Sequence, residues 1–304
     1  MKQSIYLLTV VLLSSSLLAG CKKEAKLTPT TTPEDVYGDS TLPQGNHPYD
    51  ADILQLFKKY NTLFLYKYKP HDLYYNVTDY IGGTYDTASD QTTKPGYFDV
   101  PADEAYVGVQ LDLLKELWLN YYPDSLLKKG LPQKVYLVDS FYLAYSGPGK
   151  PLDNYPTFLE AFKGGDYILA TWGSARITNI ALADKYALKS QLNADFLDLA
   201  HAQGAVTRSP AFTALTDYSA VNYYTADALG VIDYYNHGTP DTDWDLYMET
   251  IVSNSYATLT SPGNILSPDR DTNGIFLKKY NIMIAYFQSV FGVDLQAIGN
   301  ADSQ

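Results

Sequence analysis

Three ionisable side chains follow one another closely in a segment with a helical pattern. Asp195, Asp198 and His201 are each separated by three residues. Residues three or four apart lie on the same side of an α-helix, so two carboxylates and an imidazole could meet there and hold a divalent metal ion. The competing interpretation is that the aspartates are solvated or pair locally, while His201 interacts with the carboxyl end of the helix dipole. We expect the second arrangement, and no metal.

A second set of oxygen-bearing side chains precedes the last long helical pattern. Asp269, Asp271 and Asn273 alternate and Gly274 follows, which is how a calcium-binding loop opens. The twelfth position counted from Asp269 is Tyr280, where an EF-hand needs a bidentate glutamate. In the alternative interpretation the segment is a polar turn whose Asp271 or Asn273 caps the following helix. Calcium is therefore only a secondary expectation.

Cysteine chemistry is confined to one position near the amino terminus. Lys2, an apolar run over 5–13 and the sequence Leu18-Ala19-Gly20-Cys21 are arranged as in a signal peptide. The apolar run is too short to span about 30 Å of hydrocarbon as a mature helix. Leu-Ala-Gly-Cys is the pattern of a bacterial lipobox, whose cysteine receives the lipid. Because Cys21 is the only cysteine, lipidation leaves no thiol for a disulfide, a zinc site or a nucleophile.

The composition narrows the possible partners. The chain has 34 acidic and 22 basic residues, a net charge of −12 and no cluster of Lys and Arg, which disfavours nucleic-acid binding. The 29 tyrosines far outnumber the three tryptophans. Their paired occurrence fits the core and rim of an exported domain, or a face that binds sugar or peptide. The pairs are Tyr74-Tyr75, Tyr121-Tyr122, Tyr223-Tyr224 and Tyr234-Tyr235.

The predicted organisation is a signal peptide over 1–20, a lipidated flexible tether over 21–48 and one domain over 49–304. The tether is rich in Lys, Thr and Pro and lacks periodic apolar residues. Hydrophobic periodicity predicts alternating helices and strands in the domain, which indicates an α+β fold. The expected helices are one after Asp50, one ending near Tyr121, and three at 186–203, 243–254 and 274–291. The expected strands are 62–68, 134–138, 167–171 and 177–182, the last two joined by a turn at Gly173-Ser174.

In this layout the chain resembles a family of lipoproteins, the substrate-import-associated zinc metallohydrolases, also described as zinc-binding metallopeptidases. These proteins are found beside TonB-dependent outer-membrane import systems. The resemblance covers most of the mature chain and implies a single zincin-like domain, with a mixed sheet packed on helices. The matching segments are Tyr60-Asn61, 113–122, 135–138, the strand pair around Gly173 and 276–283.

The catalytic motif of that family is degenerate in this chain. Family members carry His-Glu-x-x-His on the corresponding helix, so that both imidazoles hold zinc and the glutamate activates a bound water. Here Ala194 replaces the first histidine, Asp195 the glutamate and Asp198 the second histidine. Asp243 is the nearest match to a further acidic ligand of the family. The four histidines offer no His-x-x-x-His pair, since they stand at 47, 71, 201 and 237. We expect no catalytic residues and no zinc.

The resulting hypothesis is a non-catalytic lipoprotein, accessory to a nutrient-import complex, whose vacated cleft holds a peptide or glycan. Lys22 follows the lipidated cysteine where an aspartate would favour retention at the inner membrane, so we expect the outer membrane. One alternative is an atypical metallohydrolase with a rearranged site drawn from Asp195, Asp198, His201 and Asp243. Another is a purely structural surface lipoprotein.

The lipobox makes a direct prediction for Cys21→Ser. The variant should lose all incorporation of labelled palmitate and leave the membrane fraction, because the thiol that carries the acyl glyceride is gone. Metabolic labelling of cells expressing the full chain measures this. Lys22→Ser is the matched control and should keep the label. Label retained on Cys21→Ser would show that this cysteine is not the anchor.

Overall fold

The computed structural model describes residues 42–69, 72–73, 85–86, 91–92, 96–144 and 157–301. The predicted signal peptide, Cys21 and the tether as far as residue 41 lie outside these residues. Within the described ranges, no helix combines the length and the apolar character needed to cross a bilayer.

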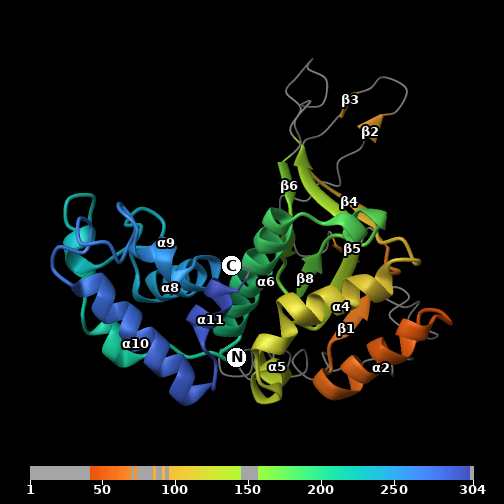
Figure 1. Ribbon diagram of the computed structural model, residues 1–304, viewed down its shortest axis with the longest axis horizontal. Coiled ribbons are helices and arrows are strands. Elements are labelled where there is room, and N and C mark those ends of the chain that lie inside the picture. The colour runs from red at the N-terminus through yellow and green to blue at the C-terminus, as the bar shows by residue number, and fades with distance from the viewer. Residues whose placement is uncertain are drawn as a thin grey trace, which may run out of the picture. The chain divides into compact units, whose positions relative to one another are not determined.

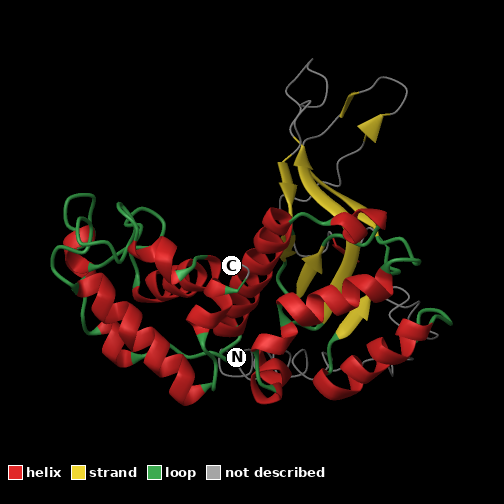
Figure 2. Cartoon of the chain, viewed as in Figure 1, coloured by secondary structure: helices red, strands yellow, loops and turns green. Residues whose placement is uncertain are grey.

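The sheet is built around one long strand, β5 (Lys134–Ala144) (Figure 2). The first half of β5 pairs with two parallel strands, and the second half with two antiparallel strands; a further strand extends the sheet beyond β8. In that order these strands are β1 (Leu63–Leu65), β8 (Tyr167–Ala170), β4 (Gly96–Pro101), β6 (Thr157–Leu159) and β7 (Ala161–Lys163). A separate antiparallel pair is formed by β2 (Tyr85–Asp86) and β3 (Gln91–Thr92). The sheet is therefore mixed.

Both faces of the first half of β5 are covered, which explains the continuous apolar run at 135–138. Val135 and Leu137 belong to the large core that includes the helices. Tyr136 and Val138 lie on the other face, in a smaller cluster with Leu169. Side chains alternate between the two faces of a strand, so neighbouring residues of β5 bury against different partners.

Helices make up most of the remaining structure. They are α2 (Pro48–Tyr60), α4 (Val107–Leu117), α5 (Asp124–Gly130), α6 (Leu182–Ala202), α7 (Pro210–Thr213), α8 (Pro240–Ser253), α9 (Tyr256–Thr260), α10 (Ile275–Val290) and α11 (Leu295–Asn300). Four short 3-10 segments, η1 (Leu119–Tyr121), η2 (Ala175–Asn179), η3 (Tyr218–Ala220) and η4 (Asp227–Leu229), occur between them. The long helix α6 packs against the sheet through β7 and β8 and against α8 on its other side (Figure 1).

Buried polar side chains hold α6 in this position. Lys189 is fully buried, and its Nζ donates to the carbonyl oxygens of Ile298 and Ala301 at the end of α11, both at 2.7 Å. A cation is favoured there because the last carbonyls of a helix carry partial negative charge. Asn193, also fully buried, donates to the carbonyl oxygen of Leu117 at the end of α4 at 2.9 Å. These hydrogen bonds connect α6 to α4 and α11.

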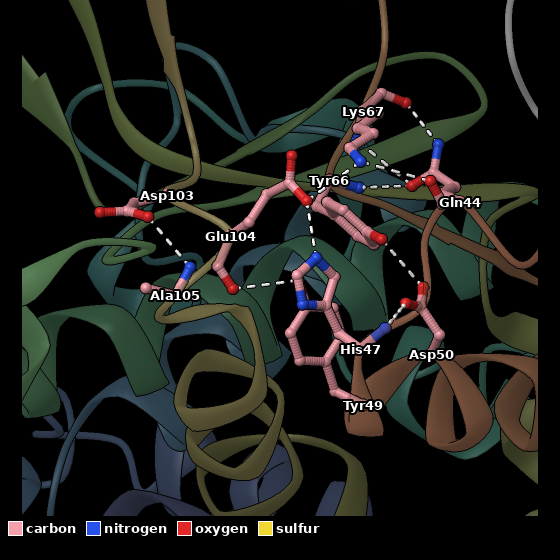
Figure 3. Close-up of polar contacts among 9 residues, drawn as sticks. All are labelled: Gln44, His47, Tyr49, Asp50, Tyr66, Lys67, Asp103, Glu104 and Ala105. Carbon is pink, nitrogen blue, oxygen red and sulfur yellow. Dashed lines mark hydrogen bonds and ion pairs between the residues drawn. The ribbon is translucent and has the colours of Figure 1, made fainter.

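The amino-terminal end of the described domain is fastened by a group of residues that we call the amino-terminal clip: Gln44, His47, Tyr66, Lys67 and Glu104 (Figure 3). Gln44 Oε1 accepts from the backbone N–H groups of Tyr66 and Lys67 at 2.9 and 3.2 Å. Glu104 Oε2 lies 2.8 Å from His47 Nε2 and 3.0 Å from Lys67 Nζ. Both contacts lower the pKa of Glu104, and the contact with Lys67 has the larger effect. The clip joins the chain before α2 to the end of β1 and to the loop before α4.

The predicted α+β class and mixed sheet packed on helices are confirmed, but two local predictions are wrong. Asp50 does not begin its helix: His47 is the N-cap, and Asp50 completes a capping box at the third helical position. The strand expected at 177–182 is instead η2 and the start of α6. Trp172 takes a left-handed conformation with φ of 77°, and the Gly173 backbone passes so close to Ala102 that a Cβ would clash. The chain therefore turns away from the sheet at this point.

A fully buried ion pair links α8 to α10. Lys279 Nζ donates to Asp243 Oδ2 at 2.7 Å and to the carbonyl oxygen of Gly230 at 2.9 Å, and both side chains are 0% exposed. Tyr218 Oη donates to the same carboxylate oxygen at 2.8 Å, and the ring of Phe212 lies 4.8 Å from the ammonium. Burial raises the pKa of Asp243 and lowers the pKa of Lys279. The contact between the two charged groups partly reverses both shifts, because each group favours the ionised form of the other.

We predict that Lys279→Ala lowers the free energy of unfolding by about 3–5 kcal/mol, because it leaves the Asp243 carboxylate buried without its cation. Urea unfolding followed by circular dichroism measures the loss. Lys278→Ala, at the exposed neighbouring position, is the control and should change stability by less than about 0.5 kcal/mol. Equal losses in the two variants would contradict a specific role for the pair.

Candidate functional site

A cavity of about 220 Å³ lies between α6 and α8, and four carboxylates line it. The lining residues are Gln191, Ala194, Asp195 and Asp198 from α6, Thr242, Asp245, Leu246 and Glu249 from α8, and His237 from the chain before α8. We call this cavity the acidic cleft. On each helix the four positions follow an i, i+3, i+4, i+7 spacing, which places them on one face. Two polar helix faces therefore oppose each other across the cleft.

The positions predicted from the degenerate motif come together here. Ala194, Asp195 and Asp198 all line the acidic cleft, whereas Asp243 does not and instead forms the buried pair with Lys279. His201 lies one turn beyond Asp198 on α6, and its ring contacts Asp245. The face of α6 that was expected to carry the chemistry is thus the face that borders the cavity.

Asp195 is the most deeply buried carboxylate of the cleft. Its side chain accepts one hydrogen bond, from Gln191 Nε2 to Oδ1 at 2.9 Å, while Oδ2 is buried with no partner among the described residues. The residue is only 8% exposed. Burial raises the pKa of Asp195 to about 6. The hydrogen bond from Gln191 and the charge of Lys163 partly oppose this rise, and the negative charge of Glu249 adds to it least. Ionisation of the Asp195 carboxyl group is therefore disfavoured, and a positive charge placed close to it would favour ionisation.

The other two members of the proposed rearranged site have partners of their own. Lys163 Nζ, on β7, forms an ion pair with Asp198 Oδ2. His201 Nδ1 lies 2.5 Å from Asp245 Oδ1, and its ring is 14% exposed. Each side chain therefore has a partner other than Asp195.

The residues present do not fit the zinc site of the family that the sequence resembles. Ala194 has a methyl group where the first imidazole would stand, and Asp198 is bound to Lys163. His237 is the histidine that lines the cleft, and its Nδ1 lies 3.1 Å from Asp233 Oδ2. No group of three His, Cys, Asp or Glu side chains is placed to hold a metal within the ranges that the structure describes.

The calcium candidates bond to backbone groups instead of converging on one point. Asp271 accepts from the backbone N–H groups of Phe276 and Leu277 at 3.0 and 2.9 Å, so it caps the first turn of α10. Asp269 accepts from the backbone N–H of Gly263 at 2.9 Å, and Asn273 donates to the carbonyl oxygen of Ala228 in η4 at 3.2 Å. This is the capping arrangement that the sequence offered as the alternative for Asp271.

Sequence reasoning did not single out most of the cleft residues on α8. From that helix only Asp243 was a candidate, and His237 was considered only among the histidines that form no His-x-x-x-His pair. The positions 242, 245, 246 and 249 do share the spacing of one helix face. Matching that pattern to the one on α6 requires knowing that the two helices pack together, which a single sequence does not contain.

Comparisons with known proteins give one structural similarity. No family model and no curated protein sequence matches the chain. Its structure is similar to the crystal structure of a "putative zinc-binding metallo-peptidase" from Bacteroides caccae, with a TM-score of 0.49 and 13% identity over 84% of this chain and 90% of that chain. Similarity at this level leaves the chemistry of the cleft to be argued from the side chains themselves.

Burial of Asp195 predicts a pH dependence of stability. The unfolded state ionises near pH 4 while the folded state keeps its proton until about pH 6, so stability should fall as the pH rises between these values. The loss should amount to about 2–3 kcal/mol. Asp195→Asn should abolish this part of the dependence, as measured by urea unfolding from pH 3.5 to 7.5. Asp112→Asn, whose side chain is 77% exposed, is the control; identical pH profiles of wild type and Asp195→Asn would contradict the raised pKa.

Proposed function

We propose that this protein is a lipid-anchored binding protein that holds its ligand in the acidic cleft without cleaving it. The observation that carries the proposal is the cleft itself: the helix face where relatives would carry the catalytic motif borders a cavity, but presents Ala194, Asp195 and Asp198. A cavity whose described side chains offer no set of zinc ligands can bind a molecule but has no means of hydrolysis through zinc.

The setting of this function is proposed from the sequence. The lipobox at Cys21 and the absence of an aspartate after it favour anchoring at the outer membrane. The family resemblance favours an accessory role beside a TonB-dependent nutrient-import system. A binding protein at that place would concentrate its ligand near the importer, an effect that needs no catalysis.

Reversing the three substitutions tests whether this helix face descends from a zinc site. The variant Ala194→His/Asp195→Glu/Asp198→His should bind stoichiometric zinc, because residues 194 and 198 border the same cavity and stand one helical turn apart. Metal analysis after chelation and zinc addition measures this. Ala194→His alone is the control and should bind no stoichiometric zinc, since a single added imidazole does not complete a site.

The same measurements on the wild-type protein decide between binding and hydrolysis. We expect no stoichiometric zinc and no cleavage of a mixed peptide library, analysed by mass spectrometry with and without added zinc. Stoichiometric zinc that is lost on Asp198→Ala, together with peptide cleavage, would refute the proposal and establish the atypical metallohydrolase instead.

A further inference from the structure

Four exposed tyrosines form an aromatic cluster on the two loops that precede α8. Tyr223, Tyr224, Tyr234 and Tyr235 are 70%, 90%, 38% and 80% exposed. Their rings contact one another in series, with centroids 5.1 Å apart for 223 and 224, 5.7 Å for 223 and 234, and 6.2 Å for 234 and 235. We call this cluster the tyrosine shelf. A contiguous exposed aromatic surface of this kind usually marks a place of contact with a partner.

The tyrosine shelf and the acidic cleft are joined by one short turn. The backbone N–H of His237 donates to the carbonyl oxygen of Asp233 at 3.1 Å, and His237 Nδ1 lies 3.1 Å from Asp233 Oδ2. This turn carries Tyr234 and Tyr235, and its last residue, His237, lines the cleft. A ligand that enters the cleft beside His237 is therefore next to the turn that carries Tyr234 and Tyr235 of the shelf.

The carboxylates of the cleft are only partly neutralised by the protein. Lys163 pairs with Asp198, and His201 with Asp245. Within the described part of the chain, neither Asp195 nor Glu249 is within ion-pair distance of a lysine or arginine, and Asp195 Oδ2 is buried without any hydrogen bond. A buried oxygen without a partner is costly, and a donor supplied by a ligand would remove that cost.

We infer that the ligand is a basic peptide segment, which places one arginine or lysine side chain in the acidic cleft and lays the adjoining residues on the tyrosine shelf. This inference rests on the proposed function and names its ligand class. The cleft offers carboxylates to several N–H donors at once, which a guanidinium satisfies best. The shelf offers aromatic faces, which attract cations and apolar side chains alike.

An uncharged glycan fits these surfaces less well. Its rings could stack on the shelf, but in the cleft its hydroxyl groups would leave the charge of the buried Asp195 without compensation. The net charge of −12 also favours the approach of a basic peptide over that of an acidic one.

The experiment compares two peptides that differ only in charge. Fluorescein-labelled Gly-Gly-Arg-Leu-Gly-Gly amide and its counterpart with citrulline in place of arginine are titrated with the full-length lipoprotein in detergent micelles, and binding is measured by fluorescence anisotropy. The arginine peptide should bind at least about tenfold more tightly, because citrulline keeps the shape and loses the charge. Glu249→Gln should weaken the arginine peptide by about tenfold and leave the citrulline peptide unchanged.

Matched variants show whether an effect on binding comes from the cleft and the shelf, or from the loss of any carboxylate or any exposed tyrosine. Tyr235→Ala should weaken both peptides several-fold, since it removes a shelf ring that either peptide contacts. The controls are Glu116→Gln on α4, whose side chain is 61% exposed, and Tyr256→Ala on α9, which is 44% exposed and lies outside the shelf. Neither control should change the affinity for either peptide.

Three outcomes would overturn the inference. Equal affinity for both peptides would show that charge is not recognised. An equal loss with Glu116→Gln would show attraction by net charge alone. Binding of a neutral oligosaccharide, lost on Tyr235→Ala but not on Glu249→Gln, would make the shelf a glycan site. Each of these leaves the proposed function standing, whereas cleavage of the arginine peptide, read by mass spectrometry on the same samples, would refute that function itself.

Discussion

The packing of α6 between the sheet and α8 is the constraint on which the rest of the structure depends. A helix covered on two sides must give every polar group on those sides a partner or a cavity. Lys189 and Asn193 meet this requirement by bonding to the ends of α11 and α4. Asp195 meets it only in part, because one of its oxygens has no partner. At the acidic cleft, the side chains of α6 border a cavity instead of packing against a neighbouring element.

The contacts that hold α6 in place do not depend on the side chains that line the cleft. Lys189 and Asn193, which form the hydrogen bonds that position α6, are not among the residues that line the cleft. None of these hydrogen bonds involves residues 194 or 198. At the cleft, Lys163 now compensates the charge of Asp198. The residues that support α6 and the residues that line the cleft therefore occupy different faces of the same helix, so the side chains at 194 and 198 can change while the packing is kept.

Much of the fold can be predicted from local sequence patterns, because strong helical periodicity reports burial on one side. The helices that became α6, α8 and α10 could be anticipated in this way. The segment 177–182 could not, since its β-branched and apolar residues suit a strand, whereas the chain turns away from the sheet at the left-handed Trp172 and at Gly173, which lies close to Ala102. Likewise the motif positions on α6 were available from the sequence, but Lys163 and Glu249 reach them from other elements through tertiary packing alone.

The amino-terminal clip has a mechanical consequence. Any pull on the chain before Leu42 reaches the domain first at Gln44 and His47, which transmit it to the end of β1 and to the loop before α4 through Tyr66, Lys67 and Glu104. The load then enters the sheet at β1, which is hydrogen-bonded to the central strand β5. Helix α8, and with it one wall of the cleft, is not in this path. A force applied to the chain before Leu42 would therefore act on the sheet and not directly on α8.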